Sequence, residues 1–185
     1  AKIYEQAGRG KMAMNWTISP ALADISPMML NHYYRKATAL DCFVSGPSGL
    51  GYAMPYDAHN SRYYASATSS KLVKPYAQLT QRYLEKAGLR VITVWDNLSP
   101  VQSKVYADNC PYLYGLTVND WERQSGRLTG RVQSKWLPIT PLYPCYANSA
   151  DVVTDFFNRD IKKFKGTSPM FVTGQVTVWD VGPDK

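Results

Sequence analysis

The stretch Arg90-Val91-Ile92-Thr93-Val94-Trp95-Asp96 is the clearest strand in the chain, because β-branched and aromatic residues fill it. A helix pattern precedes it. Apolar residues recur at helical spacing from Leu72 to Leu84, with Ser70 as a candidate cap and Gly88 as a C-terminal glycine. A shorter helix is expected over residues 101–108. A strand between two helices is the repeating unit of a parallel α/β fold.

The same alternation extends along the rest of the chain, so we predict the α/β class with a mostly parallel sheet and alternating helices. The pattern fits an open doubly wound sheet or part of a (β/α) barrel-like domain, and we prefer the second. Residues 1–185 are expected to form a single domain or the C-terminal portion of a larger one. Pro27 is expected to break or kink one helix. Further strands are predicted at 11–17, 41–45, 112–118, 130–137 and 171–179, and further helices at 19–39 and 150–164.

A glycine-rich loop follows the predicted strand 41–45. Its sequence is Gly46-Pro47-Ser48-Gly49-Leu50-Gly51-Tyr52-Ala53-Met54-Pro55-Tyr56. Glycine allows close approach of the backbone to a ligand, proline restricts the dihedral angles, and tyrosine combines a flat apolar face with a polar tip. Ligands of parallel α/β folds bind at the carboxyl ends of the strands. We therefore expect this loop to line the principal pocket, with Gly51 at a positive φ.

The segment Gly49-Leu50-Gly51-Tyr52-Ala53-Met54-Pro55 resembles the signature of the GxGYxYP family of glycoside hydrolase-like proteins, with Met54 where the family has tyrosine. Residues 15–24 resemble the family's lead-in to a helix, and residues 175–180 resemble its late strand. The resemblance covers about Met12 to Asp180. It implies a carbohydrate substrate and a place in the C-terminal part of a larger protein.

Glycoside cleavage needs two carboxyl groups, one to protonate the leaving oxygen and one to attack or to activate water. Four aspartates are expected near a strand end or the loop, and they are the candidate catalytic residues. Each also has a structural interpretation, because aspartate commonly caps helices, closes turns or ends strands. The candidates are Asp24, Asp57, Asp96 and Asp180.

Aromatic and small polar side chains near the loop are the candidate sugar-binding residues. Aromatic rings suit stacking against a sugar ring, although they also dominate protein cores. His59 follows the loop closely enough to reach a ligand. The set comprises Trp16, Ser48, Gly49, Gly51, Tyr52, Tyr56 and His59.

Cysteine and histidine spacing predicts neither a metal site nor a cofactor, because no His-x-His or Cys-x-x-Cys pattern occurs. Cys42 is expected in the core of a strand. Cys110 and Cys145 both lie beside prolines, so they could form a disulfide in an oxidising compartment. The two sequons at Asn15 and Asn97 are compatible with a secreted, glycosylated protein.

The formal net charge of +7 could indicate nucleic-acid binding, but the cations are dispersed along the sequence, so no nucleic-acid partner is predicted. The chain has no apolar run long enough to span a membrane.

Two functions remain open. The first is a secreted, carbohydrate-active glycoside hydrolase with a sugar site shaped by residues 46–56. The second is a non-catalytic carbohydrate-binding or extracellular assembly protein on the same scaffold. Because half a barrel leaves open sheet edges, we also expect the chain to pack against additional polypeptide, either a preceding N-terminal segment or another chain, and a homo-oligomer would satisfy the same need.

Overall fold

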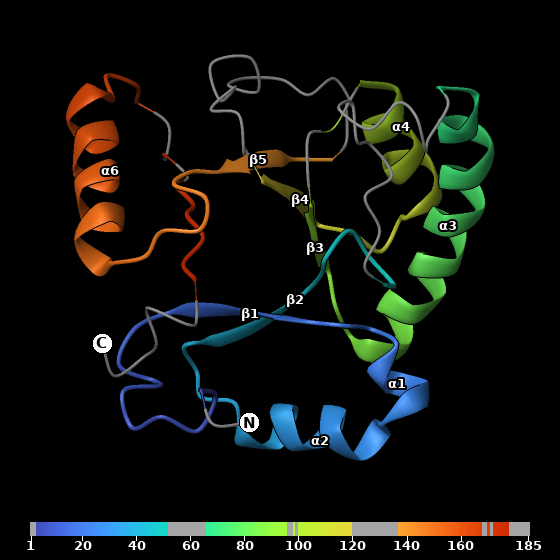
Figure 1. Ribbon diagram of the computed structural model, residues 1–185, viewed down its shortest axis with the longest axis horizontal. Coiled ribbons are helices and arrows are strands. Elements are labelled where there is room, and N and C mark those ends of the chain that lie inside the picture. The colour runs from blue at the N-terminus through green and yellow to red at the C-terminus, as the bar shows by residue number, and fades with distance from the viewer. Residues whose placement is uncertain are drawn as a thin grey trace.

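The structure is a computed structural model that describes residues 3–51, 66–95, 98, 100–119, 137–167, 170 and 172–177 (Figure 1). For residues 66–72 and 100–101 only the backbone is described. Strands and helices alternate along most of the chain. The elements are β1 (Met14–Ile18), α1 (Leu22–Ile25), α2 (Pro27–Lys36), β2 (Asp41–Ser45), α3 (Ser66–Ala87), β3 (Val91–Val94), α4 (Pro100–Asn109), β4 (Gly115–Asn119), β5 (Ile139–Leu142) and α6 (Ala150–Lys163).

The five strands form one sheet in the order β1-β2-β3-β4-β5, and every pair is parallel. This confirms the predicted α/β class. Within the part of the chain that the structure describes, the strand order shows no reversal of the kind that defines a doubly wound sheet. Such a sequential order is also that of consecutive strands in a (β/α) barrel.

The two faces of the sheet differ in character because successive side chains on a strand point to opposite faces. One face is apolar and packs against α2, α3 and α4. Figure 1 shows α3 and α4 side by side along one flank of the sheet. The other face carries small polar side chains, among them Thr93 and Thr117, which are aligned by the β3–β4 register. The apolar face includes Phe43, Ile92, Val94, Leu116 and Val118, which join one core with Val73, Ala77, Leu84 and Tyr106.

Three helix boundaries follow the expected signals, but α3 begins at Ser66, so Ser70 lies inside the helix and the prediction that it caps α3 is wrong. Pro27 is the first residue of α2 and separates it from α1, as predicted. Gly88 follows α3 with φ 71°, which is the left-handed conformation expected of a C-terminal glycine. Ser149 caps α6, since its side chain accepts a hydrogen bond from the Val152 amide.

Helix α6 lies on the left in Figure 1, whereas α3 and α4 lie on the right. Its contacts are with the segments that follow β5. The ring of Phe156 lies 4.6 Å from that of Tyr143, and Phe157 is near Gly174. Ile161 remains 57% exposed, so the apolar face of this helix is only partly covered.

One strand was not predicted and one predicted strand is absent. The strand Ile139–Leu142 was not predicted, and the predicted strand 130–137 lies outside the described residues except for Leu137. The run 139–142 contains Pro141, and proline is a weak strand former, which hid this strand in the sequence. The described residues 172–177 form no strand and make a single bridge, from Val176 to Ala147.

The prediction that Cys42 lies in the core is wrong, and the disulfide that was left open between Cys110 and Cys145 is not formed. None of the three cysteines is in a disulfide. Cys110 is buried and donates a hydrogen bond to the Ala77 carbonyl at 3.2 Å. Cys42 is exposed because strand alternation places it on the polar face of the sheet, opposite Phe43. Among the described residues, no helix is long and apolar enough to cross a membrane.

Candidate functional site at the carboxyl ends of the strands

The glycine-rich loop begins where β2 ends, so its described residues 46–51 lie at the carboxyl end of a parallel strand, as predicted. The remaining loop residues, 52–56, lie outside the described residues. Within the loop, Ser45 Oγ donates a hydrogen bond to the Gly49 carbonyl at 2.9 Å. The loop therefore folds back onto the strand that it leaves.

Ser48 joins the loop to its neighbours through three hydrogen bonds. Its amide donates to the Thr93 carbonyl at 2.7 Å, its Oγ accepts from the Trp95 amide at 3.0 Å, and its carbonyl accepts from the Tyr106 hydroxyl at 2.8 Å. The residue is fully buried, and its φ of 60° is unusual for serine. In this conformation Ser48 holds the loop in place against β3 and α4.

Two positions in the loop require glycine. A Cβ at Gly46 would lie 2.6 Å from Thr17 Cγ2, and a Cβ at Gly49 would lie 2.8 Å from Thr80. Gly49 also has φ 126°, a conformation that other residues rarely adopt. The prediction of a positive φ at Gly51 is wrong. Its φ lies outside that region, and a Cβ there would meet no described atom within 4 Å.

Tyr76 of α3 holds the end of the described loop. Its hydroxyl donates to the Gly51 carbonyl at 2.9 Å and accepts from the Gly51 amide at 3.3 Å. Burial is the largest effect on this hydroxyl and raises the pKa of Tyr76, so the phenol keeps its proton and remains a donor. The hydroxyl of Thr80 accepts a further bond, from the Leu50 amide at 3.2 Å.

Two described candidates come from outside the loop, and both are held in interactions with other residues of the chain. Asp24 on α1 is exposed and pairs with Lys86 of α3 at 2.9 Å, and the hydrogen bond from Lys86 lowers the pKa of this carboxyl. Trp16 donates from Nε1 to Asp41 Oδ1 at 2.7 Å, and its ring packs edge-on against Tyr4. The other candidates lie outside the described residues, namely Asp57, Asp96, Asp180, Tyr52, Tyr56 and His59.

Two residues that were not among the candidates join Asn119 at the carboxyl ends of β3, β4 and β5. Trp95 follows β3 and contacts Tyr146, with 5.2 Å between the ring centroids. Asn119 ends β4 and is fully buried. Its position directly after the apolar stretch 116–118 indicates a strand end from the sequence alone. Tyr146 was missed because β5, the strand before it, was not predicted.

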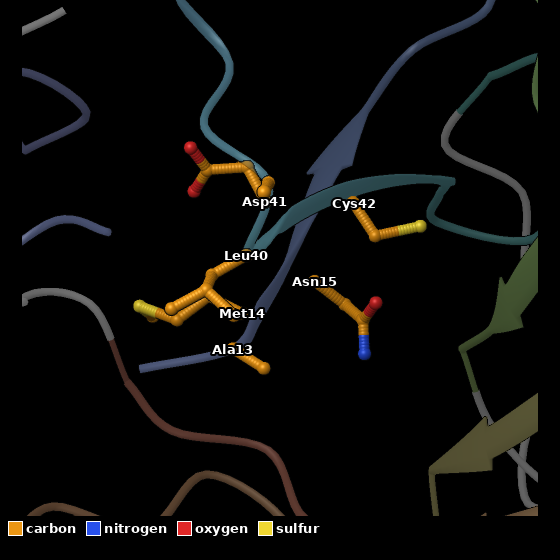
Figure 2. Close-up of a pocket in the computed structure, with 7 residues that line it drawn as sticks. Ala13, Met14, Asn15, Leu40, Asp41 and Cys42 are labelled. Carbon is orange, nitrogen blue, oxygen red and sulfur yellow. The ribbon is translucent and has the colours of Figure 1, made fainter. Parts of the chain in front are cut away.

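A pocket of about 240 Å³ lies at the opposite end of the sheet (Figure 2). Its lining residues are Ala13, Met14, Asn15, Ala39, Leu40, Asp41 and Cys42. We expected the glycine-rich loop to line the principal pocket, but none of its residues lines this one. Figure 2 shows the Asp41 carboxylate pointing away from the side on which Asn15 and Cys42 lie.

Asp41 is committed to structural hydrogen bonds. Its carboxylate accepts from Arg9, from the Trp16 indole, and from both the amide and the hydroxyl of Thr38, all within 2.9 Å. Burial alone would raise the pKa of Asp41, but these bonds together lower it to about 2. A group that stays ionised and fully bonded is poorly suited to proton transfer, so this pocket is a weak candidate for catalysis.

No group of three histidine, cysteine or acidic side chains that could hold a metal ion occurs among the described residues. The arrangement at the carboxyl ends instead offers hydrogen-bonding groups and aromatic rings, which are the contacts that a polar organic ligand requires.

Comparisons with known proteins agree with the fold. One solved structure with the same arrangement is titled "Crystal structure of a putative hydrolase from Bacteroides thetaiotaomicron VPI-5482 at 1.25 A resolution". The two chains superpose with a TM-score of 0.55 at 24% sequence identity, over 66% of this chain and 22% of the other. This chain therefore matches about a fifth of that protein's length. None of the curated proteins matches it.

The sequence profile described as "GxGYxYP putative glycoside hydrolase C-terminal domain" matches residues 1–185, which is the whole chain. The chain therefore belongs to the family of GxGYxYP C-terminal domains.

Proposed function

We propose that this protein binds carbohydrate at the carboxyl ends of its parallel strands and hydrolyses glycosidic bonds there. The observation that carries the proposal is the match of the whole chain to a family named for glycoside hydrolysis. The fold supports it, because the family's signature loop lies at the carboxyl end of β2 and is fixed there by α3, α4 and β3. A rigid loop at this edge suits a binding site.

The proposed catalytic groups are aspartates. Hydrolysis of a glycoside needs a proton donor and a second carboxylate on opposite sides of the bond. Asp24 is unsuited to the first role, because Lys86 lowers its pKa and keeps it ionised. Asp96 follows β3 in the sequence, directly after Trp95. The triplet Val-Trp-Asp occurs twice, and Asp96 ends the first copy and Asp180 the second. We propose Asp96 and Asp180 ahead of Asp57.

The second candidate function is non-catalytic carbohydrate binding on the same scaffold. The ion pair of Asp24 with Lys86 favours this second function. Asp24 is the one catalytic candidate that the structure describes, and its carboxylate is paired with a lysine. This function needs the aromatic and amide groups at the strand ends but no acid and base.

The test separates the two functions. The whole protein is incubated with a panel of α- and β-linked polysaccharides, with binding followed by affinity electrophoresis and cleavage by the release of reducing ends. Asp96→Asn and Asp180→Asn are each expected to lower kcat by about a hundredfold or more with little change in binding. The matched control is Asp108→Asn, an exposed aspartate on α4 that pairs with Lys104.

Binding without release of reducing ends by the wild-type protein would reject hydrolysis and leave the second function. Neither binding nor cleavage on any member of the panel would reject both.

The proposal extends to two further properties. We propose that the protein is secreted, because the sequons at Asn15 and Asn97 are compatible with secretion. We also propose that the sheet packs against additional polypeptide, because its sequential strand order is that of a barrel segment and this chain matches only 22% of the solved hydrolase. Sedimentation of residues 1–185 alone is then expected to show association, whereas a stable monomer would contradict this proposal.

A further inference from the structure

A fully buried amide without a hydrogen-bond partner lies at the carboxyl end of β4. Asn119 is the last residue of that strand, and its side chain is 0% exposed. Within the described part of the chain, neither its Nδ2 nor its Oδ1 has a partner. Buried amides are normally paired, because an unpaired donor or acceptor destabilises the folded protein. The described residues therefore leave this amide without a partner, and a ligand could supply one.

The polar groups one step below on the same face are satisfied. Thr117 and Asn119 are two residues apart on β4, so their side chains point to the same face of the sheet. Thr117 Oγ1 lies 2.9 Å from Thr93 Oγ1 of β3, and one of the two hydroxyls donates to the other. The sheet thus pairs its own polar groups in this row and leaves the amide at the strand end unpaired.

An aromatic pair spans the strand end where this amide lies. Trp95 follows β3 and Tyr146 follows β5, and their rings meet edge to face at 5.2 Å. Because β4 lies between β3 and β5, these two residues follow the strands on either side of the strand that ends at Asn119. Tyr146 has φ 53°, a left-handed conformation that is unusual for tyrosine and often marks functional positions.

We propose that Asn119 is the hydrogen-bonding anchor of a sugar-binding subsite whose apolar wall is the Trp95–Tyr146 pair. This inference rests on the proposed function and names residues that would carry it out. A saccharide has hydroxyl groups that both donate and accept, which matches the one donor group and one acceptor of the amide. Its C–H face suits an aromatic ring. The glycine-rich loop borders the subsite, since the Trp95 amide donates to Ser48 Oγ.

The subsite makes opposite predictions for stability and for binding. Asn119→Leu keeps the shape of the side chain and removes the unpaired polar atoms, so it is expected to raise the melting temperature by about 2–4 °C. The same change is expected to weaken oligosaccharide binding about tenfold or more, because the anchoring hydrogen bonds are lost. The matched control is Thr117→Val on the same strand. It breaks a satisfied pair, so it is expected to lower the melting temperature and leave binding unchanged.

The experiment uses the whole protein with a calorimetric panel of gluco-, manno-, galacto- and xylo-oligosaccharides. A second variant, Tyr146→Asn, removes the ring with a residue that tolerates a positive φ, and it is expected to weaken binding about threefold to tenfold. Unchanged binding by both Asn119→Leu and Tyr146→Asn would overturn the subsite and leave the proposed function standing.

A lower melting temperature for Asn119→Leu would also overturn the subsite, because the amide would then have a structural partner. If the wild-type protein binds no saccharide in the panel, the proposed function fails and the subsite fails with it.

Discussion

The hydroxyl of Tyr106 donates a hydrogen bond of 2.8 Å to the carbonyl of Ser48, joining two residues that lie 58 positions apart in the sequence. Both residues are fully buried. The bond connects α4 to the loop that follows β2, and the Ser48 amide completes the connection by donating to the Thr93 carbonyl of β3. The shape of the glycine-rich loop is therefore set by the protein interior, and a ligand would meet it already formed.

Replacing Tyr106 with phenylalanine removes this hydrogen bond and keeps the ring. We expect Tyr106→Phe to lower the free energy of unfolding by about 1–3 kcal/mol, because a buried carbonyl loses its donor. Urea denaturation measures the change. Tyr114→Phe is the control, since Tyr114 is 66% exposed and should change stability by less than about 0.5 kcal/mol. Equal effects of the two substitutions would show that the Ser48 contact adds no stability.

Two glycines of the loop should respond differently to the same substitution. Gly49→Ala is expected to destabilise the protein by about 2 kcal/mol or more, because Gly49 has φ 126° and its Cβ would lie 2.8 Å from Thr80. Gly51→Ala should be close to neutral, because its φ is ordinary and its Cβ would meet no described atom. Thermal or urea unfolding of the two variants compares them. A larger loss for Gly51→Ala would contradict the loop conformation.

The sequence predicted elements whose signals are local. The strand at Asp41–Ser45, the break before Pro27 and the last helix from Ala150 all follow from residue pattern and capping, and all are present. Strand β5 was missed because Pro141 lies within it, and that error also hid Tyr146. The signature loop was correctly placed at a strand end, but the sequence did not reveal that Gly49 rather than Gly51 has a positive φ or that Thr80 leaves no room for a Cβ at Gly49.

The site was harder to predict than the fold because its groups meet only in the tertiary structure. Trp16 was expected to stack on sugar, whereas in the structure its indole donates to Asp41 and packs on Tyr4. The sequence places Asn119 at a strand end, but the lack of a described partner for its amide is visible only in the tertiary structure. Strand alternation alone could have placed Cys42 on the opposite face from Phe43.

The three free cysteines should differ in their reactivity. Cys42 is exposed, whereas burial raises the pKa of the Cys110 thiol to about 12. We expect an aromatic disulfide reagent to modify Cys42 rapidly in the native protein and Cys110 only after unfolding. Mass spectrometry of digested protein identifies the labelled residue, and Cys42→Ser is the control. Because no cysteine is paired, a reducing agent should leave the melting temperature unchanged, and a drop would contradict the free thiols.

The hydrogen bonds that Asp41 accepts from Thr38, Trp16 and Arg9 should make stability depend on pH in the acid range. The pKa of Asp41 is lowered from 3.8 to about 2, so the folded protein holds this carboxylate ionised more strongly than the unfolded chain does. Its contribution, about 2 kcal/mol, is fully present above the unfolded pKa and is lost as the pH falls from about 4 through 2. Asp41→Asn should therefore be less stable than wild type at pH 6, and the difference should shrink towards pH 2.

Urea denaturation at several pH values measures this difference. Asp24→Asn is the control, because the Asp24–Lys86 pair is exposed and should contribute little at moderate salt. The side chain of Asp41 is fully buried, so its contribution should persist when salt is added. A stability difference between wild type and Asp41→Asn that stays constant from pH 6 to pH 2 would show that the carboxylate is not held by Arg9, Trp16 and Thr38 as the structure has it.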